Sequence, residues 1–369
     1  MMKARTFIWL LVRPFYRLSK KARRIPGILV WQLYDRRRCL KLDRLKENLK
    51  SNNTLSYYND LDQKLHKNES SSFIGIIKDV KLYGPYRLAI TSSNKVIADN
   101  SVPIDSSVYK AVAYSLPSRL PNMSDVESND SVLNLVNPLS CWYYHWMLEC
   151  LTRLCPYDRA CRSFSIQFSI LIPNDAPSFI PESLKILGYE DRIVTSDKPV
   201  VLAKNFLVSS YRRINGRLPK SACQWLRNVF FRALDITSSD TTKPRDIYIS
   251  RKHAQKRRVV NEEELTENLE SRGFEIHELE NLPLADQIKL FANARTVIAP
   301  HGGGLTNIIF SSRKDFHVIE LNRANEPNGC YRNLASDNGL KFSQIACEED
   351  DLDYIVDLNH VNYTLDSKR

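Results

Sequence analysis

Three consecutive glycines stand directly behind a histidine in the segment APHGGGLTNIIF, residues 299–310. The whole chain holds 11 glycines, and each glycine loses conformational entropy when it folds. An apolar run precedes the glycines and apolar residues at helical spacing follow them, so we expect a strand, a tight turn and a helix. A glycine-rich turn lets backbone N–H groups approach a phosphate, and the start of a helix adds positive charge. The segment is therefore predicted to bind a diphosphate.

The candidate ligands of that diphosphate are His301, Gly302, Gly303, Gly304, Thr306 and Asn307. A dinucleotide-binding fingerprint is excluded, because Asn307 stands where its last glycine should be. A P-loop is excluded because no Gly-Lys-Ser/Thr follows, and a lipase-like oxyanion loop because no GxSxG elbow occurs. A tight turn without any ligand remains the alternative.

A basic loop follows a second apolar run, residues 246–250, and its cations are Arg251, Lys252, Lys256, Arg257 and Arg258. If residues 246–250 and 296–299 are parallel strands, this loop and the glycine turn meet at one edge of the sheet. Arg251 is closest to the strand end and is the best candidate for a bidentate phosphate contact, supported by Lys252 and Arg257. A solvated charged surface is the alternative explanation. Glu320 ends a third run and is a candidate to bind a ribose or sugar hydroxyl, or else a surface carboxylate.

A predicted helix over residues 143–154 carries His145, Glu149 and Arg153 four residues apart, hence on one face. Either His145 or Glu149 could serve as a general base. Arg153 and Trp146 are predicted to support the acceptor side of the site. Taken by itself, the pattern is explained as well by a core helix with a Glu149–Arg153 ion pair.

Short strands and helices alternate along the rest of the chain, which predicts two Rossmann-like, doubly wound α/β domains facing a central cleft. Asn261 and Glu264 predict a capped helix start, and Gly273 its end. The two Asp-x-Asp strings, at residues 60–62 and 351–353, are interpreted as surface acids. The predicted boundaries are a basic helical arm at 1–50, a polar linker at 51–72, an N-terminal domain at 73–236, a C-terminal domain at 237–345 and a tail at 346–369.

The positive charge of the chain is concentrated in the arm. Residues 1–50 hold fifteen Lys and Arg and three acids, a net +12, whereas the whole chain carries +11 and its body therefore −1. This neutral body argues against a nucleic-acid enzyme. Basic residues interleaved with aromatic and aliphatic ones suit an anionic membrane surface, although a helical face packed on the body is equally compatible. The apolar patches of the arm are too short to span a bilayer, and eight cysteines without a CxxC pair argue against a disulfide framework or structural zinc.

Taken together, three segments resemble glycosyltransferase family 61: the Tyr144-to-Arg153 helix, residues 248–265 with the basic loop, and residues 300–307. The resemblance spans about residues 70–345. Glu149 stands where the family usually has Asp, and Gly303 stands where Ala is common. The resemblance implies a GT-B-like fold and an inverting transferase whose nucleotide-sugar donor is held mainly by the C-terminal domain.

From this resemblance we expect Arg251 and the glycine turn to neutralise the donor diphosphate, and Glu149 or His145 to deprotonate an acceptor hydroxyl. We expect no cofactor and no metal requirement. The expected acceptor is a glycan or lipid-linked glycan in capsule or other cell-surface polysaccharide biosynthesis, at the cytoplasmic face of the plasma membrane. A phosphonucleotide-dependent sulfotransferase and a non-catalytic glycan-assembly scaffold are the alternative functions.

Overall fold

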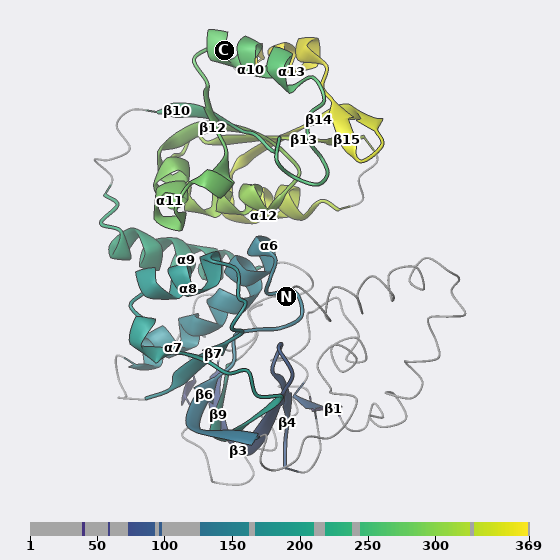
Figure 1. Ribbon diagram of the computed structural model, residues 1–369. Coiled ribbons are helices and arrows are strands. Elements are labelled where there is room, and N and C mark those ends of the chain that lie inside the picture. The colour runs from purple at the N-terminus through teal and green to yellow at the C-terminus, as the bar shows by residue number, and fades with distance from the viewer. Residues whose placement is uncertain are drawn as a thin grey trace.

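The computed structural model describes residues 73–92, 126–161, 167–209, 218–237, 244–324 and 328–367, with three short strands at 39–40, 58–59 and 96–97. They form a nine-stranded sheet in the N-terminal half and a six-stranded sheet in the C-terminal half (Figure 1). Nearly all of the basic arm and the linker, and a strand expected at 108–114, lie outside the described residues. The predicted membrane contact of the arm therefore stays a prediction.

The sheet of the N-terminal half is mixed. Its order is β1-β5-β4-β3-β9-β6-β7-β8, with β2 beside β3. Among the described strands, β9, β6, β7 and β8 pair in parallel along one side, and the short strands β1 and β5 pair in parallel at the other edge. β3 runs antiparallel to both β4 and β9, so the predicted doubly wound pattern holds for one side of the sheet alone. The strands are β1 (Cys39–Leu40), β2 (Tyr58–Asn59), β3 (Phe73–Tyr83), β4 (Leu88–Ile90), β5 (Val96–Ile97), β6 (Val126–Leu133), β7 (Ser169–Ile172), β8 (Ile193–Thr195) and β9 (Val200–Ser209).

Besides the stretch at residues 143–161, the described part of this half contains two α-helices. α8 (Phe179–Ile186) ends at Gly188, whose φ of +78° is the left-handed conformation that favours glycine. α9 (Lys220–Ala233) buries one apolar stripe. The predicted 143–154 helix is a succession of α6 (Tyr143–His145), η5 (Trp146–Cys150), η6 (Leu151–Arg153) and α7 (Leu154–Cys161).

The sheet of the C-terminal half has the order β11-β10-β12-β13-β14-β15, and all its strands except β15 are parallel. From β10 the chain goes to β11 on one side and then to β12 on the other, so β10 and β12 form a topological switch point, where open α/β sheets bind ligands. The elements are β10 (Arg245–Ile249), α10 (Glu262–Ser271), β11 (Glu275–His277), η9 (Leu279–Asn281), α11 (Leu284–Asn293), β12 (Ala294–Pro300), η10 (Gly303–Phe310), β13 (His317–Arg323), α12 (Cys330–Asn338), β14 (Lys341–Asp350), β15 (Asp353–Ile355) and α13 (Leu358–Asp366).

Two features of this half differ from the sequence prediction. The expected boundary at residue 345 falls inside β14, and the segment taken as a tail contributes Tyr354, Val356 and Val361 to the core. The capping box of α10 does not form, because the Asn261 amide exchanges hydrogen bonds with the Val356 backbone, at 2.9 and 3.0 Å. Asn261 therefore ties the start of α10 to the end of β15.

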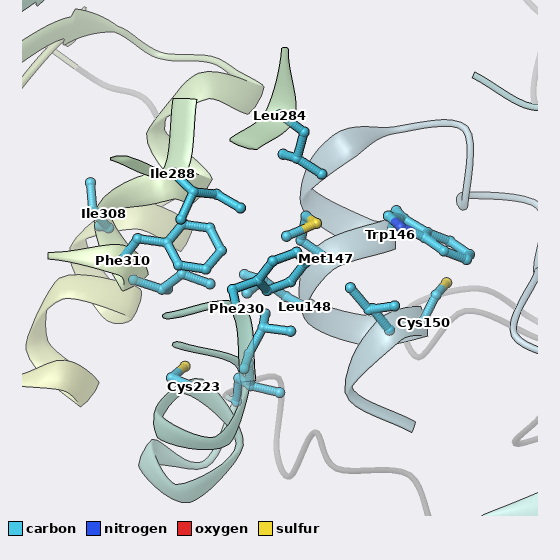
Figure 2. Packing of buried hydrophobic residues seen from close by; sticks show 14 of the residues in the cluster. Trp146, Met147, Leu148, Cys150, Cys223, Phe230, Leu284, Ile288, Ile308 and Phe310 are labelled. Atoms are coloured by element: carbon cyan, nitrogen blue, oxygen red, sulfur yellow. The ribbon is translucent and has the colours of Figure 1, made fainter. Parts of the chain in front are cut away.

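The two halves share one hydrophobic cluster. α6, α8 and α9 of the N-terminal half meet α11, η10 and α12 of the C-terminal half (Figure 1). Met147 and Phe230 pack in the same cluster as Ile288 and Phe310 (Figure 2), and the Phe230 and Phe310 rings lie edge to face at 5.5 Å. A large apolar interface of this kind opposes free relative motion of the halves.

Candidate functional site

The carboxyl ends of β10 and β12 bring Arg251 and the glycine turn together. A Cβ added to Gly302 would lie 2.2 Å from Nη1 and 2.7 Å from Cζ of Arg251. Gly302 has a φ of 178°, which any residue adopts. Glycine is therefore needed here for the close approach of the guanidinium group and not for a special backbone conformation.

The other two glycines have different neighbours. A Cβ on Gly303 would lie 3.6 Å from Cβ of Tyr143, an ordinary contact, whereas a Cβ on Gly304 would lie 2.7 Å from Cδ1 of Leu279. The three consecutive glycines thus face a cation, α6 of the N-terminal half and the core. The turn leads directly into η10, a 3₁₀-helix.

The surroundings of Arg251 disfavour its positive charge. Burial and then the neighbouring Arg257 lower the pKa of Arg251. The Nε atoms of both arginines are buried and have no hydrogen-bond partner within the described residues, although Nη2 of Arg251 donates to the Lys256 carbonyl at 3.3 Å. Two adjacent guanidinium groups with unused donors are stabilised by an anion between them.

The remaining cations of the basic loop have other partners. Lys252 is exposed and forms an ion pair with Glu278, and Arg258 forms one with Asp353, at 2.6 Å. Asp353, expected to be a surface acid, is instead buried at the start of β15. Of the predicted cationic ligands, Lys252 therefore already has an acidic partner, whereas the Nε atoms of Arg251 and Arg257 have no hydrogen-bond partner within the described residues.

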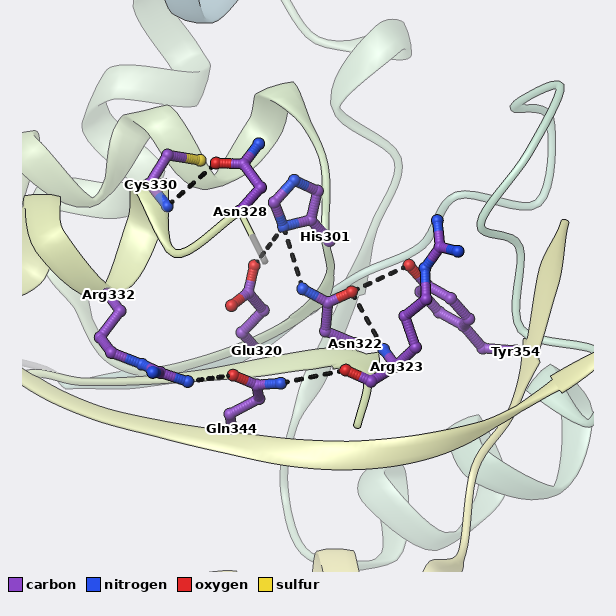
Figure 3. Close-up of polar contacts among 9 residues, drawn as sticks. All are labelled: His301, Glu320, Asn322, Arg323, Asn328, Cys330, Arg332, Gln344 and Tyr354. Atoms are coloured by element: carbon purple, nitrogen blue, oxygen red, sulfur yellow. Dashed lines mark hydrogen bonds and ion pairs between the residues drawn. The ribbon is translucent and has the colours of Figure 1, made fainter. Parts of the chain in front are cut away.

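His301 directly precedes Gly302, against which Arg251 lies, and its imidazole is paired with a carboxylate. Its Nδ1 is 2.5 Å from Oε1 of Glu320, and both side chains are buried (Figure 3). The predicted role of Glu320 as a ligand of a ribose or sugar hydroxyl is corrected by this geometry, because its carboxylate faces His301.

Thr306 and Asn307 are fully buried in η10, so their predicted side-chain bonds to a diphosphate are also corrected. Oδ1 of Asn307 accepts a hydrogen bond from the Tyr143 hydroxyl at 2.5 Å, and its Nδ2 donates to Gln287 at 3.2 Å. Asn307 therefore links η10 to α6 and α11.

A single π-helical turn, η5, interrupts the helix that carries His145 and Glu149. The Leu151 N–H closes it on the carbonyl of Trp146, and such turns occur frequently at functional sites. Nδ1 of His145 lies 2.9 Å from Oε2 of Glu149, and the His145 side chain is 26% exposed against 1% for Glu149. His145 is therefore the member of the pair that can meet a substrate.

Trp146 and Arg153 do not line this surface. Both are completely buried, and the Trp146 indole donates to the Ser183 hydroxyl at 2.8 Å. Their predicted role in contacting the acceptor side is replaced by a role in the core.

Two tyrosine rings lie between the two histidine–glutamate pairs, His145–Glu149 in the N-terminal half and His301–Glu320 in the C-terminal half. Tyr144 lies edge to face against His145 at 5.3 Å and against Tyr331 at 5.8 Å, and Tyr331 lies at 5.0 Å from His301. Burial raises the pKa of Tyr331 well above its ordinary value, so this ring remains neutral. Tyr331 lies in α12 outside every motif and was not among the predicted site residues.

The described residues contain no cluster of three or more His, Cys, Asp or Glu that could hold a metal ion. In the same part of the chain, no helix has the length and apolar character that a membrane crossing demands.

Comparison with known proteins agrees with the segments that form this site. Residues 143–319, which include His145, Arg251 and His301, match the Glycosyltransferase 61 family model. A stretch of 139 residues, 34% of this chain, is 32% identical to the EGF domain-specific O-linked N-acetylglucosamine transferase of Drosophila melanogaster. The stretch covers 26% of that relative, so the chain spans about a quarter of its length.

Proposed function

Because the chain carries a glycosyltransferase 61 domain over residues 143–319, we propose that it transfers a sugar, with inversion, from a nucleotide-sugar donor to a hydroxyl of a glycan. The observation that carries the proposal is the guanidinium of Arg251 seated on Gly302 at the switch point of the C-terminal sheet. Fixed cations and dipoles aimed at a leaving group that gains charge are usually a large part of catalysis. Arg251, Arg257 and His301 act on the diphosphate in this way.

His145 is the general base in this proposal, and Glu149 orients it. The exposed imidazole can reach an acceptor hydroxyl, whereas the buried carboxylate at 2.9 Å holds the ring and stabilises the imidazolium that forms. The N-terminal half thus supplies the acceptor side and the C-terminal half the donor side, in a GT-B-like arrangement.

The test is incubation with a panel of nucleotide sugars, followed by the release of free nucleoside diphosphate. A donor carrying N-acetylglucosamine is the first choice, because the relative named above transfers that sugar. We expect Arg251→Ala and His301→Ala to reduce turnover of the accepted donor at least about 100-fold, and Lys252→Ala, an exposed cation paired with Glu278, to retain it. Full activity of Arg251→Ala would refute the proposal, and binding of 3′-phosphoadenosine compounds instead would favour a sulfotransferase.

We further propose that the arm at residues 1–50 docks on an anionic membrane, where the enzyme extends a cell-surface polysaccharide or its lipid-linked precursor on the cytoplasmic side. Its net charge of +12 supports this, since each cation near such a surface contributes about 1 kcal/mol. Separation of membranes from cytosol, for the full chain and for a variant without residues 1–50, tests the docking.

Because the arginines and His301 supply positive charge, activity is expected to survive EDTA.

A further inference from the structure

We infer that Glu320 is a positioning residue that fixes which ring nitrogen of His301 carries the proton, so that His301 binds a diphosphate only as a charged imidazolium. The inference rests on the proposed donor site for its functional consequence. It assigns to Glu320 and to the adjacent Asn322 a task that the family match, which ends at residue 319, does not cover.

The orientation of the Asn322 amide is fixed by its neighbours. Its Oδ1 accepts from the Arg323 N–H at 3.0 Å and from the Tyr354 hydroxyl at 3.1 Å (Figure 3). Because the Arg323 N–H can only donate, the amide atom that faces it must be Oδ1, and Nδ2 must be the atom that lies 3.2 Å from Nδ1 of His301. An amide nitrogen can only donate.

Two neighbours of Nδ1 of His301 therefore favour opposite protonation states of that nitrogen. Glu320, when ionised, can only accept a hydrogen bond and favours a proton on Nδ1, whereas Asn322 favours a bare Nδ1. The contact with Glu320 is 2.5 Å and charge-assisted, and the contact with Asn322 is 3.2 Å. The shorter and stronger bond decides the competition in favour of Nδ1–H.

This choice has a consequence at the opposite ring nitrogen. With the proton on Nδ1, a neutral ring has a bare Nε2, whose lone pair repels phosphate oxygens. Only the doubly protonated ring offers Nε2–H to the diphosphate, and the Glu320 carboxylate stabilises its positive charge. Diphosphate affinity should therefore fall when the ring loses its second proton.

Two of the groups near His301, Tyr331 and Arg251, keep their charge state around neutral pH. Tyr331 faces the ring at 5.0 Å, and burial raises its pKa well above the ordinary value. Arg251, seated on Gly302, remains a cation. His145 pairs with Glu149 beyond the two tyrosines, and the exposed His253 lies 3.4 Å from Glu278 on the basic loop. The exposed pair of His253 and Glu278 is a further histidine–glutamate pair, and its removal serves as a control for the removal of the Glu320 carboxylate.

The experiment combines ¹⁵N–¹H NMR of the imidazole rings with calorimetric titration of UDP, in the absence of acceptor, from about pH 6 to about pH 9. In the wild type we expect His301 to carry its proton on Nδ1 when neutral. In Glu320→Ala, Asn322 is the remaining partner of Nδ1, so the proton should move to Nε2. Because the terminal phosphate of UDP also changes charge in this range, and does so equally for every variant, the quantity compared is the ratio of the wild-type affinity to the variant affinity. UDP should bind Glu320→Ala at least about tenfold more weakly than the wild type at pH 6, and the two affinities should converge as the wild-type ring loses its second proton.

Three further measurements keep the outcomes separate. Glu278→Gln, which removes the carboxylate of the comparison pair, should retain the pH dependence of the wild type. Glu320→Leu, which likewise offers no hydrogen-bond acceptor, serves if Glu320→Ala does not fold. A wild-type spectrum with the neutral proton on Nε2, or the same pH dependence in both Glu320 variants as in the wild type, would overturn the inference. Failure of UDP to bind while the Nδ1 proton is observed counts against the proposed donor site and leaves the role of Glu320 standing.

Discussion

At Gly302 a side chain from a distant strand, and not the backbone torsion, imposes the choice of glycine. In Gly302→Ala the methyl group would occupy the place of the Arg251 guanidinium, 2.2 Å from Nη1. Since that guanidinium ends a flexible side chain, it can move away at little cost in stability. We expect a loss of donor turnover approaching that of Arg251→Ala, with a change of less than about 0.5 kcal/mol in the free energy of unfolding. Steady-state kinetics and denaturant unfolding measure the two quantities.

Gly303→Ala is the matched control, because its methyl group would meet Tyr143 at an ordinary 3.6 Å. The variant should retain donor turnover within about twofold. Equal losses in the two alanine variants would mean that the turn as a whole, and not the seat of Arg251, matters for the reaction.

Several candidate site residues were predicted from the sequence, but not all the side chains that they contact. Arg251 and His301 could be found because their chemistry and their places after apolar runs point to an anion. Glu320 and Asn307 were also selected, yet both act through other residues, because the sequence does not reveal which side chain an inward-facing polar group will meet. Tyr331 carries no local signal, since its importance arises from the rings that it touches.

Among the elements, α6 and η10 are joined by the hydrogen bond from Tyr143 to Asn307. In Tyr143→Phe this buried bond is lost and Oδ1 of Asn307 is left without that donor, which should lower the free energy of unfolding by about 1–3 kcal/mol. Chemical denaturation measures the loss. Tyr363→Phe, at an exposed tyrosine, should change stability by less than about 0.5 kcal/mol. An unchanged midpoint in Tyr143→Phe would show that the contact between α6 and η10 does not depend on this bond.

The short strand β15 fixes the basic loop, a role that the sequence prediction of a tail did not anticipate. The Arg257 N–H donates to the Leu352 carbonyl at 2.7 Å, and Asp353 accepts from the Arg258 backbone and guanidinium. The strand is three residues long, too short for a periodic pattern to predict it.

The hydrogen bond from Arg258 lowers the pKa of Asp353. A carboxyl with a lowered folded-state pKa contributes stability above its unfolded-state pKa, near 3.8, and loses it as the pH falls through the folded-state value. Asp353→Asn should therefore be less stable than the wild type at pH 7, and the difference should shrink below about pH 4. Unfolding midpoints between pH 3 and pH 7 provide the test, with Asp351→Asn, at an exposed position in the same hairpin, as the control. A difference that stays constant down to pH 3 would contradict the assigned ion pair.

For the molecule as a whole, the sequence predicted alternating α/β units and a common sheet edge for the two anion-binding loops. It did not predict β6, because polar residues hide that strand. It also did not predict the antiparallel side of the first sheet, because pairing direction leaves little trace in a single strand. Nor did it predict the hydrophobic cluster that the two halves share, since the sequence of an amphipathic helix such as α11 does not reveal which element packs against its apolar face.

That shared core predicts a single unfolding transition for the two halves. All five tryptophans precede residue 237, so tryptophan fluorescence reports on the N-terminal part of the chain, whereas far-UV circular dichroism reports on both halves. Phe310→Ala removes a fully buried ring of the C-terminal half that packs against Phe230. It should cost about 3–5 kcal/mol and shift the fluorescence and dichroism midpoints together. Leu352→Ala, exposed in the same half, should shift neither.

If Phe310→Ala lowers the dichroism midpoint and leaves the fluorescence midpoint in place, the halves unfold independently. The histidine pairs at His145 and His301 would then be held together by the substrate and not by the fold.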